Sequence, residues 1–184
     1  MVARSAAAHN LEARPSPNSR TGGGGGSPPA IPSASTYSLL KTAAGQRGVW
    51  DAERPAARRV LEQRAPSGCI DALLADDDSA EAWAAAVANP GWQLDDRQWE
   101  RLAAAREPDD PAAAFEVYLR LAATALQDAT KNAYRTAVRY LQAGRRAAGH
   151  AALDQAFSEH MATLRDQHRR RPTLIAMLDK AKLP

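Results

Sequence analysis

The sequence predicts an all-α protein: an array of antiparallel helical hairpins, either tetratricopeptide-like or a bundle, that follows a disordered N-terminal tail. Three observations lead to this prediction. Apolar residues recur at helical spacing through most of the chain after residue 49, helix-capping residues precede these stretches, and no segment shows the sustained alternation of a strand. Much of the 45% hydrophobic content is alanine, the strongest helix former, so the helices should approach one another closely.

Residues 1–48 are predicted to form a disordered tail rich in proline, glycine and serine. Five consecutive glycines, Gly22–Gly26, precede a Ser-Pro-Pro sequence. Such a segment buries too little apolar surface to offset the entropy lost on ordering. The sequence allows one short helix over 36–44, and residues 49–184 are predicted to form the helical domain.

The first helix of that domain is expected to begin with Asp51 as its N-cap and to run to about Arg64. Pro66–Gly68 would form a loop, and a helix over Cys69–Ala75 would follow. A further helix would follow the Cys69–Ala75 helix and would end before Asn89, Pro90 and Gly91.

Two capping-box patterns mark later helix starts. Asp78 is followed three residues later by Glu81, and Asp95 is followed by Gln98. In such a box each side chain bonds the backbone N–H of the other residue. The sequence therefore predicts helices that begin after Asp78 and after Asp95.

The clearest hairpin consists of helices over 111–127 and 132–148, joined by a short loop. Asp110 and Pro111 supply an N-cap and a first-turn proline, and Gly149 stands where a C-cap glycine belongs. A further helix ends before Pro172, and a short last helix opens at Thr173. The large side chains expected in the core, beside the leucines, are Trp83, Trp92, Trp99, Phe115, Tyr118, Tyr134, Tyr140 and Phe157.

The charges are unevenly distributed along the chain. Residues 49–134 hold nine basic and sixteen acidic residues, whereas residues 135–184 hold ten basic and four acidic residues. The densest cluster, His168–Arg171, could contact phosphates or an acidic protein, or could complement a helix end and pair within the domain. We take Arg165, Arg169, Arg170 and Arg171 as the candidate binding residues.

No pattern of catalytic or metal-binding residues stands out, and we expect a non-enzyme without a cofactor or a metal site. Cys69 is the single cysteine, which excludes an intrachain disulfide and a cysteine-cluster zinc site. His160 and His168 lie too far apart on one helix to share a metal. The adjacent aspartates Asp76–Asp78 are interpreted as a solvated loop. The single cysteine and the lack of a long apolar run favour a cytoplasmic protein without a membrane span.

The stretch from Asp71 to Pro184 carries several motifs that resemble a known family. They include Ala82-Trp83, Arg97-Gln98-Trp99, Ala133-Tyr134-Arg135 and, most specifically, the ending from His168 to Ala181. This stretch is similar to the C-terminal helical region of bacterial, actinobacterial-type SWIM zinc finger proteins. The resemblance implies a helical tail that follows a zinc finger in a longer protein.

The finger itself needs a Cys-x-Cys pair followed by Cys-x-His, and Cys69 stands alone. The zinc and DNA-binding roles of that finger therefore do not transfer to this chain. The chain is interpreted as a truncated relative, a gene remnant or a stand-alone helical module. Its expected function is non-catalytic protein interaction with an unidentified partner, through the concave face between hairpins or the Arg-rich terminal turns. The alternative is nucleic-acid binding by the basic C-terminal third.

Overall fold

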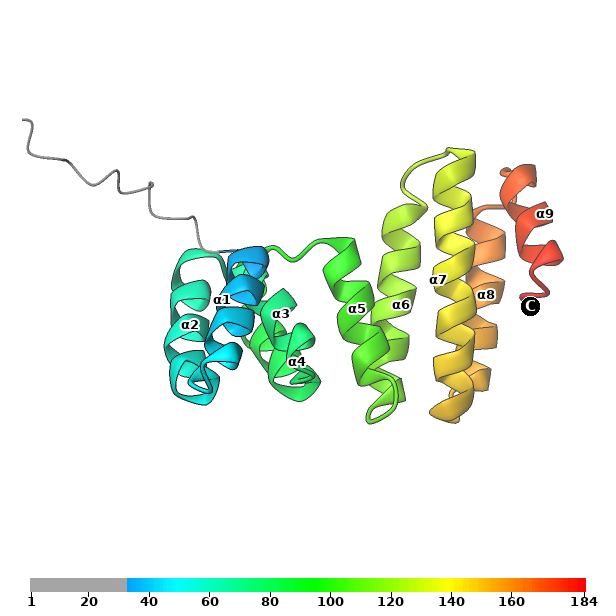
Figure 1. Ribbon diagram of the computed structural model, residues 1–184. Coiled ribbons are helices and arrows are strands. Elements are labelled where there is room, and N and C mark those ends of the chain that lie inside the picture. The colour runs from blue at the N-terminus through cyan, green and yellow to red at the C-terminus, as the bar shows by residue number, and fades with distance from the viewer. Residues whose placement is uncertain (1–32) are drawn as a thin grey trace, which may run out of the picture. The chain divides into compact units, whose positions relative to one another are not determined.

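The structure is a computed structural model that describes residues 33–184, and every element in this part of the chain is helical (Figure 1). This confirms the predicted all-α class. Residues 1–32, which hold most of the predicted tail, lie outside the described residues. The helices are α1 (Ala34–Gln46), α2 (Trp50–Arg64), α3 (Pro66–Ala75), α4 (Ser79–Ala88), the 3₁₀ turn η1 (Pro90–Trp92), α5 (Asp96–Arg106), α6 (Pro111–Ala125), α7 (Lys131–His150), α8 (Asp154–Gln167) and α9 (Pro172–Lys180).

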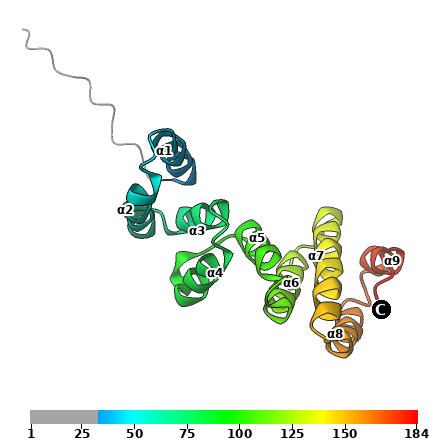
Figure 2. The same cartoon turned by 60° about the horizontal axis from the view of Figure 1, so that its bottom comes forward.

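The helices form successive antiparallel hairpins, as Figures 1 and 2 show. Each helix from α1 to α7 packs against the next one in sequence, and α1 also packs on α3, α3 on α5, and α7 on α9. The odd-numbered helices therefore lie next to one another in one layer. This neighbour-to-neighbour packing is typical of helical-repeat arrays and differs from a bundle around one central core.

Two ion pairs with the same sequence offset join α5 to α7 within that layer. Glu100 pairs with Arg139, and Glu107 pairs with Arg146, each across 39 residues. Both the two acids and the two arginines are seven residues apart, or two helical turns. Such a constant offset requires α5 and α7 to run parallel, as expected for alternate helices of an array.

Small residues allow the close helix packing that the composition predicts. The buried Gly144 of α7 faces Tyr118 and Leu119 of α6, where a Cβ atom would lie 3.5 Å from a Leu119 methyl group. Five of the eight expected aromatic anchors are buried, whereas the three tryptophans are half-buried. The nearly inaccessible alanines of the core are Ala72, Ala82, Ala103, Ala114, Ala122, Ala137, Ala147 and Ala148.

One of the two predicted capping boxes is present. The Asp95 side chain accepts from the Gln98 backbone N–H at 2.7 Å, and the Gln98 side chain accepts from the Asp95 backbone N–H at 3.2 Å. Asp110 likewise caps α6, as predicted, by accepting from Ala113 N–H at 3.1 Å. These contacts span only three residues, which is why sequence spacing alone was sufficient to predict them.

The second box, Asp78 with Glu81, was predicted wrongly. Asp78 is the N-cap residue of α4, but its side chain makes no capping hydrogen bond. Both carboxylates instead bond the guanidinium of Arg58 on α2. A charge-assisted contact with an arginine replaces the local cap here.

Three predicted helix boundaries also differ in the structure. The Pro66–Gly68 segment forms the first turn of α3 instead of a loop, because proline suits the first helical position. Asp51 lies inside the first turn of α2 and is not its N-cap. Gly149 lies within α7, and Ala152 adopts the left-handed φ of 56° after that helix.

Helix α1 packs on α2 and α3, although the sequence predicts that the helical domain begins only at residue 49. It is longer than the predicted 36–44 helix, and its Tyr37 is buried with only 3% of its surface exposed. Tyr37 meets the Trp50 ring edge-on at 5.2 Å between centroids. The helical array therefore begins before residue 48, because the buried Tyr37 anchors α1 to it.

Candidate functional site

Two of the four candidate arginines bind other segments of the chain. Arg165 bonds the backbone oxygens of Leu183 and Pro184 at 2.8 and 2.7 Å and pairs with Asp179 at 2.8 Å. Arg171 donates to the Leu126 carbonyl at the C-terminal end of α6, at 2.8 Å. Both arginines therefore tie chain segments together.

The other two candidates lie on the surface at the α8–α9 turn. Arg169 pairs only with Asp166, at 3.2 Å, and both side chains are at least 70% exposed. Arg170 is exposed and makes no hydrogen bond or ion pair with residues 33–184. A partner can reach these two cations without breaking an internal contact of a buried group. Pairing within the domain, one of the alternatives for these cations, occurs for Arg165 with Asp179 and for Arg169 with Asp166, both in the C-terminal third.

A groove of about 320 Å³ lies between α7 and α9, and sequence reasoning missed it. Its floor is apolar, formed by the half-buried Val138, Met177 and Ala181. We call it the α7–α9 groove. Its polar lining residues are Arg135, Arg139, Gln142 and Lys180.

The sequence of α7 explains why this groove is basic. The helix contains five lysines and arginines and no acidic residue, and three of them recur every four residues on adjacent turns, at Lys131, Arg135 and Arg139. The 9-residue α9 spans about 14 Å, less than half of the roughly 30 Å of the 20-residue α7. Helix α9 therefore leaves part of α7 uncovered.

The cations of the groove differ in how firmly they are held. Arg139 bonds Glu100 and lies over the Tyr140 ring at 4.6 Å. Arg135 makes one exposed hydrogen bond, to Asn132 at 3.0 Å. Lys180 is exposed and has no ion-pair partner in the described part of the chain. Arg135 and Lys180 are thus the cations most available to a ligand.

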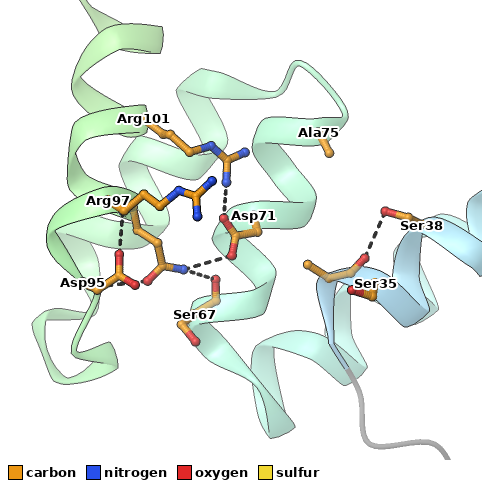
Figure 3. A pocket seen from close by; sticks show the side chains of 10 residues that line it. Ser35, Ser38, Ser67, Asp71, Ala75, Asp95, Arg97 and Arg101 are labelled. Atoms are coloured by element: carbon orange, nitrogen blue, oxygen red, sulfur yellow. Dashed lines mark hydrogen bonds and ion pairs between the residues drawn. The ribbon is translucent and has the colours of Figure 1, made fainter.

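A second, polar groove of about 560 Å³ lies between α1, α3 and α5 (Figure 3). Asp71 bonds Arg101 and accepts from Gln98 Nε2 at 3.1 Å, and the same amide donates to the Ser67 carbonyl at 2.8 Å. Arg97 points into the opening in Figure 3. Most of the polar groups here already bond one another, and these contacts hold α5 against α3.

A crevice of about 470 Å³ between α6 and α8 contains both helix histidines, His160 and His168. Burial lowers the pKa of His160, and Glu116 opposes this shift only in part. Burial and the nearby Arg171 lower the pKa of His168. Both imidazoles are therefore neutral near pH 7. No group of three or more metal-ligating side chains occurs within residues 33–184.

The aspartate loop is not fully solvated, contrary to the sequence interpretation. The Asp76 side chain is only 4% exposed and contacts Lys41 Nζ at 2.6 Å, Tyr37 Oη at 2.6 Å and Arg58 at 2.8 Å. Burial alone would raise the pKa of Asp76, but these three donors outweigh it and lower the pKa. Burial and the hydrogen bond to Asp76 raise the pKa of Tyr37 to about 12.

Cys69 is buried in α3 with 5% of its surface exposed. Burial raises the pKa of its thiol to about 11, with a smaller contribution from the negative charge of Glu62. A thiol of this kind carries almost no thiolate at neutral pH and is a poor nucleophile.

No helix in the described residues is both long and apolar enough to cross a membrane. Comparison with protein families, with curated proteins and with solved structures finds no match for this chain.

Proposed function

We propose that this chain is a non-catalytic helical module that binds another protein through its basic C-terminal surface. That surface comprises the α7–α9 groove and the exposed Arg169 and Arg170. The observation that carries the proposal is the groove itself, in which an apolar floor is bordered by accessible cations on a scaffold of packed helices. Apolar centres with polar rims are the usual construction of protein-binding surfaces.

Nucleic-acid binding is the alternative, and the charge of residues 135–184 supports it. Phosphate binding depends on accessible cations and falls steeply with salt. Arg165, Arg139 and Arg146 already contact carboxylates, and Arg171 contacts a carbonyl. The apolar Val138, Met177 and Ala181 contribute nothing to phosphate contacts. A protein ligand uses both components of the groove, so it is the favoured partner.

We also propose kinship with the C-terminal helical region of SWIM zinc finger proteins, on the motifs between Asp71 and Pro184. This kinship implies a tail module and no zinc-dependent role, because Cys69 is the single cysteine and its thiol is buried.

Site-specific photocrosslinking tests the proposed function. A benzophenone amino acid is placed at Gln142 in the groove, at Arg170, or at the exposed Glu62 of α2 as the control. The full chain is irradiated in a lysate of the cells that produce it. We expect one nuclease-resistant protein adduct from Gln142 or Arg170, absent from Glu62, that forms again with the purified partner. Adducts that nuclease removes, or no adduct at either position, would contradict the proposal.

A further inference from the structure

We infer that the occupant of the α7–α9 groove is an amphipathic helix of a partner protein, with an apolar stripe and acidic flanks. This inference rests on the proposed function and names the class of partner. Three properties of the groove support it: the shape of the opening, the apolar floor, and the sign of the charges around it.

The shape suits a helix because the groove runs between two packed helices. Val138 and Gln142 lie one turn apart on α7, and Met177 and Ala181 lie one turn apart on α9. From Arg135 to Gln142 the groove follows α7 for two turns, about 10 Å. An amphipathic helix inserts side chains at positions i, i+3 or i+4, and i+7 into such a groove.

The floor supplies the apolar contact. Val138, Met177 and Ala181 pack against the buried side chains of α6 to α9 and stay partly accessible. Methionine is flexible and polarisable, so Met177 adapts its shape to an incoming side chain. The floor therefore accepts leucine-sized anchors more readily than a phosphate or a sugar.

The charges select an acidic partner. Arg135, Arg139 and Lys180 lie at the groove, and Glu100 compensates only Arg139. The one acidic residue of α9, Asp179, already pairs with Arg165 of α8. Glutamates on both flanks of an apolar stripe would meet Arg135 on the α7 side and Lys180 on the α9 side.

The test uses a fluorescein-labelled 18-residue peptide with leucines in one helical stripe and alanine and glutamate elsewhere. A peptide of the same composition with the stripe scrambled is the first control, and the same peptide with lysine in place of glutamate is the second. Fluorescence anisotropy with the full-length chain measures the dissociation constants. A fluorescein-labelled DNA duplex is measured in parallel.

Two charge-matched double variants distinguish the contribution of the groove to peptide binding from that of the α8–α9 turn. Arg135→Glu with Lys180→Glu changes the groove, whereas Arg169→Glu with Arg170→Glu makes the same charge change at the α8–α9 turn. We expect the groove variant to bind the striped peptide about tenfold more weakly, and the turn variant to stay within about twofold of the natural chain. Val138→Ser, which removes apolar contact without changing charge, should weaken binding about fivefold. Far-UV circular dichroism confirms that each variant is folded.

Several results would overturn the inference. One is equal binding of the striped and scrambled peptides, and another is an equal effect of the two double variants. A third is a groove variant that loses DNA affinity and keeps peptide affinity. If the photocrosslinking at Arg170 succeeds while these measurements fail, the protein-binding function stands and the groove is not its site.

Discussion

Arg58 is the residue whose removal should most weaken the α1–α4 end of the array. Its guanidinium lies between α1, α3 and α4, with 15% of the side chain exposed. It bonds Asp76, Asp78, Glu81 and the Tyr37 hydroxyl. We consider Arg58→Met, which replaces the arginine with an unbranched apolar side chain and so removes the charge.

The expected loss comes mainly from Asp76. That carboxylate is nearly inaccessible, and a hydrogen bond to a buried charged group contributes about 1.5–3 kcal/mol. Asp78 and Glu81 are 37% and 63% exposed, so their ion pairs add at most about 1 kcal/mol each. Lys41 and Tyr37 still bond Asp76 in the variant and limit the damage. The free energy of unfolding should therefore fall by about 2–4 kcal/mol.

Urea denaturation followed by far-UV circular dichroism measures this loss. The matched control is Arg59→Met on the same helix, because Arg59 makes only an exposed 3.4 Å contact with the Pro55 carbonyl. The control should change the free energy of unfolding by less than about 0.5 kcal/mol. Equal losses for the two variants, or no loss for Arg58→Met, would refute the assigned role of the Asp76 network.

Three further predictions concern titration, reactivity and capping. The pKa of Glu107 is lowered, first by hydrogen bonding from Arg146, and that of Asp76 is lowered as well. Their stabilisation is therefore complete above the unfolded-state pKa values, 4.5 for Glu107 and 3.8 for Asp76, and is lost as the pH falls through the lower folded-state values. Acid titrations of the thermal midpoint with and without Glu107→Gln would show this. Cys69, with its thiol pKa raised to about 11, should react with a thiol reagent only as fast as the chain unfolds, and rapid labelling of the native protein would be inconsistent with its burial. Asp95→Ala removes the observed capping box and should lower the free energy of unfolding by about 1 kcal/mol, whereas Asp78→Ala, which removes no cap and only a partly exposed ion pair with Arg58, should lower it by less than about 1 kcal/mol.

The sequence predicted the helices well where the deciding contacts were local. Asp95 and Asp110 cap their helices through residues three positions away, so spacing was enough to identify them. The same reasoning failed for Asp78, because Arg58 lies 20 residues away and takes its carboxylate. It also assigned α1 to the tail, since Tyr37 of this helix packs on Trp50 and bonds Asp76, 39 residues further along the chain.

The candidate site was harder to predict for the same physical reason. Arg165, Arg169, Arg170 and Arg171 look alike in the sequence. The carbonyl that accepts from Arg171 lies 45 residues away, and one that accepts from Arg165 lies 18 residues away. The α7–α9 groove combines Val138 with Met177, which come together only because α9 packs on α7. The basic charge of residues 135–184 was visible in the sequence, and the absence of acidic residues in α7 was the signal that could have located the basic surface on this helix.

The most direct test of a protein-binding groove between α7 and α9 is to map the amide resonances of the full-length chain by NMR during titration with the striped acidic peptide. We predict saturable shifts confined to residues 135–142 of α7 and 177–181 of α9, with little change in α2 or α4. Shifts centred on other helices, or no saturable shift at any described residue, would contradict the account.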